Sequence, residues 1–256
     1  MSESEPLPDF LEEAKRIVRE ADKRGIPIRI MGACAIRLHL TPETAEFHEK
    51  FLDRQLTDLD FMSYRKFVEE ARKLFTDLGY VWDEYLATVY PDRDLFHDPV
   101  NKRTVDLFYD RLYMCHTIDF RGRLELDHPT ITVSDLLLEK LQIVRMGPKD
   151  VKDLIVLFID HEVGESDEDM INKKYIAKLF ANDWGFYYTA TNNLKRLRDE
   201  FLDAFKVPED KKEIIRRRIN ELLEAIEKEP KSLKWKMRAK IGPRKKWYRE
   251  VEEVIR

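Results

Sequence analysis

The fold of this chain is decided by two short stretches, IRIMGAC at residues 28–34 and TDLDF at residues 57–61. The first predicts an apolar strand over residues 28–31, followed by a tight turn of small residues. The second predicts a strand on which Asp58 and Asp60 share one face, because side chains alternate along a strand. Neighbouring carboxylates repel each other unless a cation lies between them, and Mg²⁺ takes such oxygen ligands. The plainer interpretation, the polar face of an edge strand, stays open at this point.

A third carboxylate is expected on another strand. The sequence predicts a hairpin with strands at 94–97 and 103–109, joined by a turn at 98–101. Asp106 falls in the second strand, between two apolar residues. An unpaired carboxylate inside a central strand would cost folding energy, so a functional role is the better interpretation of Asp106.

Spacing of apolar residues separates a mixed half from a helical half. Helices are expected at 9–23, 33–40 and 64–78, strands at 80–90, 117–120 and 124–126, and helices from residue 134 onward. An acidic loop is expected at 162–169. We therefore expect an α+β fold with a small mixed sheet flanked by helices over residues 1–129 and an all-helical region over 130–256.

Composition limits the possible functions. The chain has 256 residues, of which 38% are charged, and its net charge is -4, so any nucleic-acid contact must be a local basic patch. Cys34 and Cys115 lack metal-type spacing, and the six histidines form no helical ligand pair, so no zinc site is expected. No apolar run is long enough to cross a membrane, and residues 1–5 lack the features of a signal peptide; we expect a cytoplasmic protein that binds no membrane.

These residues resemble the nucleotidyltransferase superfamily, in the branch of the AbiEii-type toxins and related minimal nucleotidyltransferases. The family pattern is a strand with a small-residue turn, an Asp-x-Asp strand preceded by Arg and Ser or Thr, a third strand-borne carboxylate, and helices bearing Lys and Asp-x-x-Asp. The matching residues, in order, are Gly32-Ala33, Arg54, Thr57-Asp58-Leu59-Asp60, Val105-Asp106-Leu107, Lys140, and Lys149-Asp150-Val151-Lys152-Asp153. The resemblance covers residues 28 to 157.

The resemblance implies a Mg²⁺- or Mn²⁺-dependent enzyme that moves a nucleoside monophosphate from a nucleoside triphosphate onto a hydroxyl of RNA, a protein or a small molecule. Asp58, Asp60 and Asp106 would hold metal, and Asp106 would alternatively accept the proton of the incoming hydroxyl. Helix N–H groups after Gly32 would face the phosphates. Lys140 would add a positive charge there. The remaining motif residues would help to bind the nucleotide: Ala33, Arg54, Thr57, Lys149, Asp150 and Asp153.

Other interpretations of the same residues stay open. Lys140 could pair with surface acids, and Asp150 and Asp153 could form helix ion pairs with Lys149 and Lys152. Ala33 stands where the family has Gly or Ser, which favours the alternative of a catalytically degenerate nucleotide-binding or protein-interaction module. A helical scaffold with a purely structural αβ half is a third hypothesis. The acceptor, the base preference, the oligomeric state and a toxin role are not fixed by the residues.

The C-terminal region carries a basic tail. Residues 231–249 contain nine lysines and arginines and no acid, interleaved with Trp235, Trp247 and Tyr248. RNA binding uses cations for phosphates and aromatic rings for bases, so RNA is an expected partner of this tail. A solvated helix whose tryptophans pack on the core is the alternative.

Overall fold

The computed structural model describes residues 5–251 and divides them into two compact units. The first contains the chain up to His39, together with Gln55–Tyr113 and Ile118–Thr132. The second contains Leu40–Arg54, Met114–Thr117 and the chain from Val133 onward. The segment Leu40–Arg54 thus groups with the helical second unit, although it precedes the Asp-x-Asp strand in sequence. Residues 1–4, which were considered for a signal peptide, lie outside the described part.

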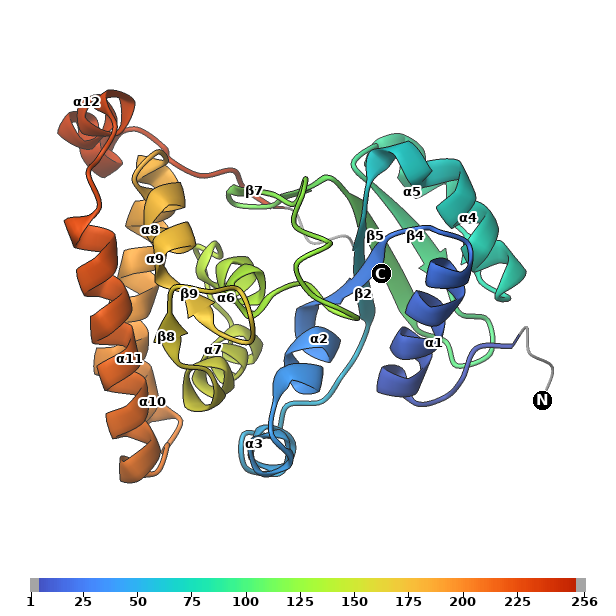
Figure 1. Cartoon of the computed structure of the whole chain (residues 1–256), viewed down its shortest axis with the longest axis horizontal. Coiled ribbons are helices and arrows are strands. Elements are labelled where there is room, and N and C mark those ends of the chain that lie inside the picture. The colour runs from blue at the N-terminus through green and yellow to red at the C-terminus, as the bar shows by residue number, and fades with distance from the viewer. Residues whose placement is uncertain (1–4, 252–256) are drawn as a thin grey trace. The chain divides into compact units, whose positions relative to one another are not determined.

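The first unit is built on a mixed sheet (Figure 1), as expected for an α+β fold. The order of its five strands is β1(Ile28–Met31), β2(Leu59–Ser63), β5(Thr104–Tyr109), β4(Arg93–His97) and β3(Val81–Trp82). β2 and β5 are parallel, whereas β1–β2, β5–β4 and β4–β3 are antiparallel. The predicted hairpin of β4 and β5 is confirmed, and its turn forms because the Asp98 carboxylate accepts hydrogen bonds from the N–H groups of Val100 and Asn101, each at 2.9 Å.

Helices of the first unit bury an aromatic core against the sheet. They are α1(Phe10–Lys23), α2(Gly32–His39), α4(Val68–Asp77), which follows a 3₁₀ turn at Arg65–Phe67, and α5(Glu84–Val89). Figure 1 shows α1 and α4 beside each other along the sheet. Phe75 of α4 stacks on Phe96 of β4 and meets Phe61 of β2 edge-on, at centroid distances of 4.4 and 5.9 Å. All three rings are fully buried, and such aromatic side chains contribute strongly to core stability.

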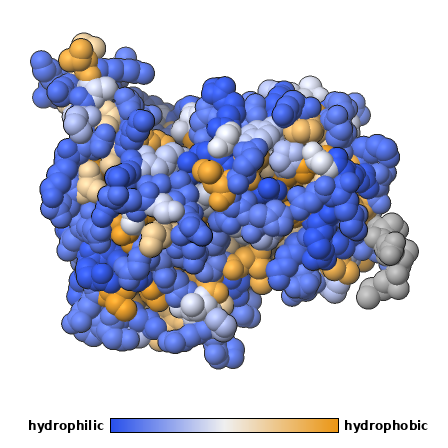
Figure 2. Space-filling model, viewed as in Figure 1, coloured by the Kyte–Doolittle hydropathy of each residue, from blue (hydrophilic) through white to orange (hydrophobic). Residues whose placement is uncertain are grey.

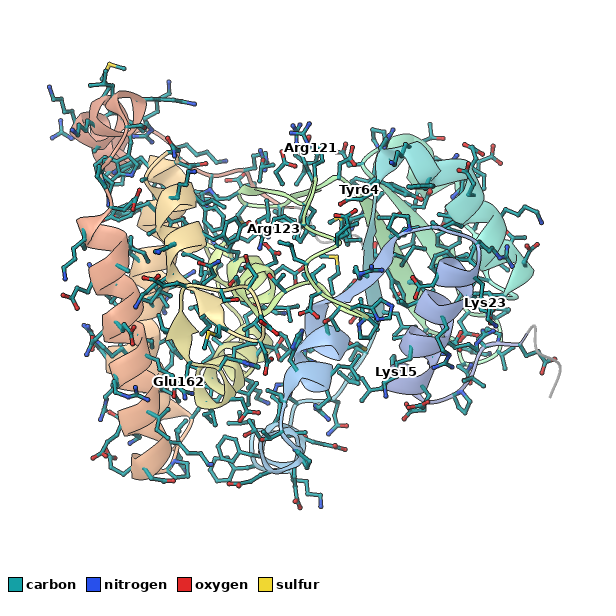
Figure 3. All side chains as sticks on the ribbon, viewed as in Figure 1. Lys15, Lys23, Tyr64, Arg121, Arg123 and Glu162 are labelled. Carbon is teal, nitrogen blue, oxygen red and sulfur yellow. The ribbon has the colours of Figure 1, made fainter. Side chains whose placement is uncertain are left out.

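α1 is amphipathic, as its sequence predicts. Its buried face includes Ile17 and Val18. Lys15 and Lys23 lie on its outer face, where they pair with Glu12 and Glu20 (Figure 3) at 3.1 and 2.7 Å. These exposed pairs one turn apart add only a few tenths of a kcal/mol each, so burial of the apolar face is what holds α1 on the sheet.

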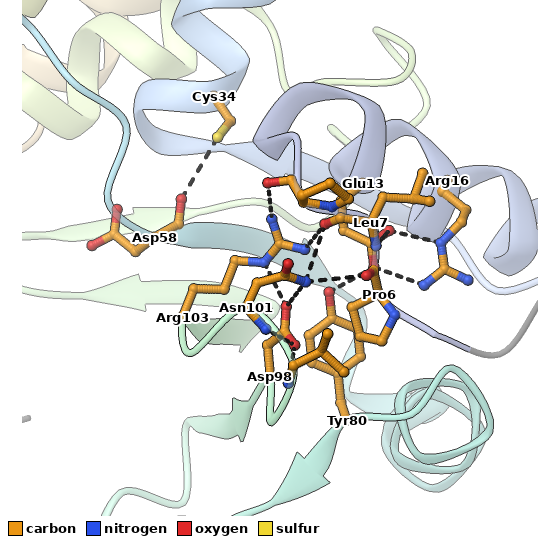
Figure 4. A network of polar contacts seen from close by, with 12 residues as sticks. Pro6, Leu7, Glu13, Arg16, Cys34, Asp58, Tyr80, Asp98, Asn101 and Arg103 are labelled. Atoms are coloured by element: carbon orange, nitrogen blue, oxygen red, sulfur yellow. Dashed lines mark hydrogen bonds and ion pairs between the residues drawn. The ribbon is translucent and has the colours of Figure 1, made fainter. Parts of the chain in front are cut away.

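A buried polar network fixes the chain that leads into α1 (Figure 4). Arg103 forms an ion pair with Asp98 at 2.8 Å and donates to the carbonyl oxygen of Pro8 at 3.3 Å. Tyr80 donates its hydroxyl proton to Glu13 at 2.7 Å. Burial, reinforced by the Glu13 carboxylate, raises the pKa of Tyr80 far above its usual value, so the phenol stays a donor.

Several local predictions are wrong. The segment 80–90 is a strand at Val81–Trp82 alone, because the Asp83 side chain accepts from the Leu86 N–H at 2.9 Å and starts α5. Residues 124–126 form a turn rather than a strand. The strand expected at 117–120 is present as β7(Thr117–Asp119), paired with β6(Arg111–Tyr113). The acidic segment expected as a loop contains β8(Val163–Gly164), which pairs with β9(Ile171–Asn172).

The second unit is mostly helical, although the short strands β8 and β9 lie within the region that was expected to be all-helical. Its helices are α3(Pro42–Glu46), α6(Val133–Leu141), α7(Pro148–Asp160), α8(Lys173–Phe180), α9(Trp184–Arg196), α10(Leu202–Ala204), α11(Glu209–Lys228) and α12(Leu233–Ile241). α9 passes into α10 through a π-helical turn at Leu197–Phe201, and another such turn, Phe47–Phe51, follows α3. None of the helices in residues 5–251 is both long and apolar enough to cross a bilayer.

Candidate functional site

The carboxylates of Asp60 and Asp106 are brought together by the parallel pairing of β2 and β5. In that pairing Asp60 stands directly opposite Asp106. Residues opposite each other on neighbouring strands project from the same face of the sheet, and the strands are about 4.8 Å apart. Asp58 was expected inside the strand, but β2 begins at Leu59, so Asp58 lies one residue before it. Asp58 and Asp60 are half-buried and Asp106 is fully buried.

The Gly32 turn lies against the Asp60 carboxylate. Gly32 is the first residue of α2 and has φ +64°, a conformation that favours glycine. A Cβ on Gly32 would lie 2.5 Å from Oδ2 of Asp60. The absent side chain is therefore what lets the carboxylate approach the start of a helix, where the helix dipole favours negative charge. Ala33 follows in the first turn of α2 and is buried.

Asp58 is connected to the same helix. The Cys34 thiol, in the first turn of α2, lies 3.6 Å from the backbone carbonyl oxygen of Asp58 (Figure 4). Thr57 is exposed, and its hydroxyl donates to the Asp58 carboxylate at 3.3 Å. Gly32, Thr57, Asp58 and Asp60 thus meet around the start of α2.

Arg93 is a residue of this site that the sequence reasoning missed. Its Nη1 lies 3.2 Å from Oδ1 of Asp106. Leu95 is opposite Asp106 across β4 and β5, and Arg93 lies two residues from Leu95, hence on the same face. Arg93 directly precedes the strand predicted at 94–97, and its pairing with Asp106 requires the register of β4 and β5. Arg93 balances the buried charge of Asp106, which would otherwise be costly.

The carboxylates of this site are the groups that could bind a metal ion. Within the described residues, no group of three or more His, Cys, Asp or Glu side chains is arranged to hold a metal ion. Mg²⁺ is commonly bound through one or two carboxylates together with substrate phosphates, rather than by a cage made wholly of protein. Asp60 and Asp106 fit that type of site, in which nucleotide and metal bind together.

The second unit holds a different cluster, centred on Asp153. Its carboxylate is fully buried and lies 3.0 Å from His48 Nε2, 3.0 Å from Arg54 Nε and 2.9 Å from Lys140 Nζ. Lys140 Nζ is also 3.6 Å from Asp150, whose other oxygen accepts from the Gly147 N–H at 3.0 Å at the start of α7. Four predicted residues therefore meet here, namely Arg54, Lys140, Asp150 and Asp153.

The electrostatics of this cluster are internally balanced. Burial would lower the pKa of Lys140, but Asp153 and Asp150 outweigh it and hold that pKa above its usual value. Burial would raise the pKa of Asp153, yet Lys140, His48 and Arg54 hold it well below its usual range. The contacts favour the structural role of Lys140 that the sequence left open. Asp153 does not pair with its helix neighbours: Lys152 donates to the Asp53 carbonyl oxygen at 2.8 Å.

His48 was missed because it lies far from Asp153 in sequence. The segment 40–54 carries both His48 and Arg54 and belongs to the second unit. Thr41 caps α3 by accepting from the Thr44 N–H. Lys149, a predicted nucleotide-binding residue, is exposed on the first turn of α7.

Comparison with protein-family models and with curated proteins gives no match to this sequence.

Replacing Gly32 by alanine tests the close approach of Asp60. Gly32→Ala and Gly25→Ala both place a Cβ at positive φ, +64° and +68°, which costs about 1–2 kcal/mol. A Cβ at Gly25 meets nothing within 4 Å, whereas at Gly32 it collides with Asp60. We expect Gly32→Ala to lose roughly 1–3 kcal/mol more in urea unfolding, the cost of overpacking. Equal losses in the two variants would contradict the contact.

The Asp153 cluster predicts a large and pH-dependent loss of stability. Asp153→Asn leaves Lys140 and Arg54 buried without their carboxylate, so we expect a loss of about 3–5 kcal/mol in urea unfolding at neutral pH. Because its pKa is depressed in the folded state, Asp153 stabilises the protein above the ordinary aspartate pKa of about 3.9, and this contribution disappears as the pH falls through the folded-state pKa.

The matched control is Asp210→Asn on α11, where the side chain is exposed. It should stay within about 0.5 kcal/mol of the parent chain. A loss for Asp153→Asn as small as that of the control would show that the cluster contributes little to stability.

Proposed function

We propose that this protein is a Mg²⁺-dependent nucleotidyltransferase, which moves a nucleoside monophosphate from a nucleoside triphosphate onto a hydroxyl of RNA, a protein or a small molecule. The observation that supports it most is the in-register pairing of Asp60 with Asp106, beside Asp58 and against the Gly32 turn. Carboxylates are the groups that hold magnesium in phosphoryl-transfer enzymes. Mn²⁺ would serve the same ligands.

The chemistry follows from the residues of the first unit. The acceptor oxygen forms a bond to the α-phosphorus of the triphosphate, the bond to the β-phosphate oxygen breaks, and pyrophosphate leaves. The metal, when bound, neutralises phosphate charge and polarises the phosphorus centre. Asp58 and Asp60 would hold it. Asp106 would be a further ligand or would take the proton of the attacking hydroxyl, and the first N–H groups of α2 would face the β- and γ-phosphates.

A catalytically degenerate nucleotide-binding module is the second candidate, and two observations favour it. Arg93 already balances the charge of Asp106, at 3.2 Å. Ala33 provides no hydroxyl to the phosphates at the position after Gly32. Such a protein would bind triphosphate through the same carboxylates and transfer nothing.

Removal of one carboxylate tests both candidates. With α-³²P-labelled triphosphates and Mg²⁺, Asp60→Asn should lower transfer of label by roughly 100-fold or more, because even indirect partners of a metal ligand are worth 10–100-fold. Glu70→Gln removes an exposed carboxylate from α4 and should leave transfer unchanged. Undiminished transfer in Asp60→Asn and in Asp106→Asn would rule out this site.

Binding of a nucleoside triphosphate is measured by the change in melting temperature. A non-hydrolysable triphosphate with Mg²⁺ at about 100 times its Kd should stabilise the parent chain by about 2.7 kcal/mol. The same addition should leave Asp60→Asn unchanged. A rise in melting temperature without transfer, for all four bases, would select the degenerate module over the enzyme.

A further inference from the structure

A hollow in the second unit is lined by residues that neither cluster uses. Its volume is about 630 Å³, within the usual range for ligand pockets. The walls come from the start of α9, from α12 and from the segment after it, and they include Trp184, Trp235, Arg238, Trp247 and Tyr248. Three of the four tryptophans of the chain line this one hollow.

The segment after α12 is held firmly on α9. The Trp247 Nε1–H donates to the Thr189 hydroxyl at 3.0 Å, and that hydroxyl lies 2.9 Å from His116 Nε2. A Cβ on Gly185 would lie 2.6 Å from the Trp247 carbonyl oxygen, so the glycine permits this approach. Burial lowers the pKa of His116 to about 4, and the neutral ring can accept the Thr189 proton. The aromatic wall is therefore an ordered surface.

Several cations of the tail lie close together in sequence and have no carboxylate partner among the described residues. Lysines such as Lys15 and Lys73 pair with carboxylates. By contrast, within residues 5–251 no carboxylate pairs with five of the tail cations, namely Lys234, Lys236, Lys240, Arg244 and Lys245. Arg238 contacts no carboxylate of this described part either. It donates to the carbonyl oxygens of Gly242 and Lys245, at 2.6 and 2.7 Å, and stacks on Trp184 at 4.4 Å.

One acid, Asp183, also lines the hollow. Asp183 caps α9, where its carboxylate accepts from the Phe186 N–H at 3.0 Å. Trp235 is packed edge-on against Tyr187, and its buried Nε1–H has no hydrogen-bond partner within the described residues. An unsatisfied buried donor is costly.

We propose that this hollow binds single-stranded RNA, with a base against its aromatic wall and flanking phosphates on Lys234, Arg238 and Lys245. Aromatic rings stack on bases, and unpaired cations bind phosphates. The hollow admits about one nucleotide unit and excludes a duplex, and single strands in cells are mostly RNA. The binding does not depend on the transfer reaction; that bound RNA is the acceptor would rest on the proposed function.

A lipid surface is the other occupant that the exposed side chains allow. Leu233, Met237 and Ile241 are exposed along α12, with Leu233 at 79%, and Figure 2 shows hydrophobic side chains among hydrophilic ones there. Met237 and Ile241 also line the hollow together with the aromatic rings, so that of these three residues only Leu233 lies outside its lining. The position of the rings favours RNA over an anionic bilayer.

The test measures binding of a labelled short oligouridylate. Binding is detected by fluorescence anisotropy across a salt series and by quenching of tryptophan fluorescence. Lys234→Glu with Lys245→Glu should weaken binding about tenfold or more and should lower the slope of log Kd against log salt by about 1.4, since each phosphate contact on a single strand contributes about 0.7. Tyr248→Ala should weaken binding about tenfold with little change of slope, because stacking is not ionic.

The matched control is Lys195→Glu with Lys206→Glu, which makes the same charge change at exposed positions outside the tail. Equal affinity of the two double variants would overturn the proposal. So would equal or tighter binding of the deoxy oligonucleotide, or binding to anionic phospholipid vesicles without binding to RNA. Asp60→Asn should bind RNA like the parent chain, so failure of RNA binding and failure of transfer are separate results.

Discussion

The parallel register of β2 and β5 is the constraint on which the first unit depends. It places the side chains of Asp60 and Asp106 opposite each other, a like-charged pair that folding alone would not favour. Two features of the same unit reduce the repulsion. The start of α2 lies against Asp60 because Gly32 has no side chain, and Arg93 lies 3.2 Å from Asp106. These two contacts allow the fold to hold two adjacent carboxylates.

The Asp153 cluster stabilises the packing of the second unit. It joins α7 to α6 through Lys140 and to the segment 40–54 through His48 and Arg54. Arg54 and Asp153 are almost fully buried, and pairs of that kind are strongly destabilising when one partner is removed. This explains why residues 40–54 group with the helical unit despite their place in the sequence. The motif Lys149–Asp153 therefore contributes two carboxylates to structure, and both of them contact the Lys140 ammonium.

Sequence periodicity was sufficient for the elements that bury a regular face. Sequence alone predicted α1, the hairpin of β4 and β5, and helices in the region after residue 134. Burial of one face requires apolar residues at a regular spacing, and this spacing is visible in the sequence. Predictions failed where one polar contact decided the outcome, as at Asp83, whose cap turned an expected strand into α5. Partners distant in sequence, Arg93 for Asp106 and His48 for Asp153, required the strand register and the packing of helices, which a single sequence does not contain.

The buried carboxylates of the two clusters have cation partners, whereas some lysines of the tail have no carboxylate partner in the described chain. In the Asp153 cluster and at Asp106, each buried carboxylate has a cation beside it, so these charges are balanced within the fold. On α12 and the segment after it, the tryptophans do pack on α9, as the plainer interpretation of the tail expects, while Lys234 and Lys245 pair with no carboxylate of the described chain. Packing of the rings and availability of the cations are therefore compatible. A rigid aromatic wall lowers the entropic cost of holding a base, and the unpaired charges next to it attract the phosphates that any such base carries.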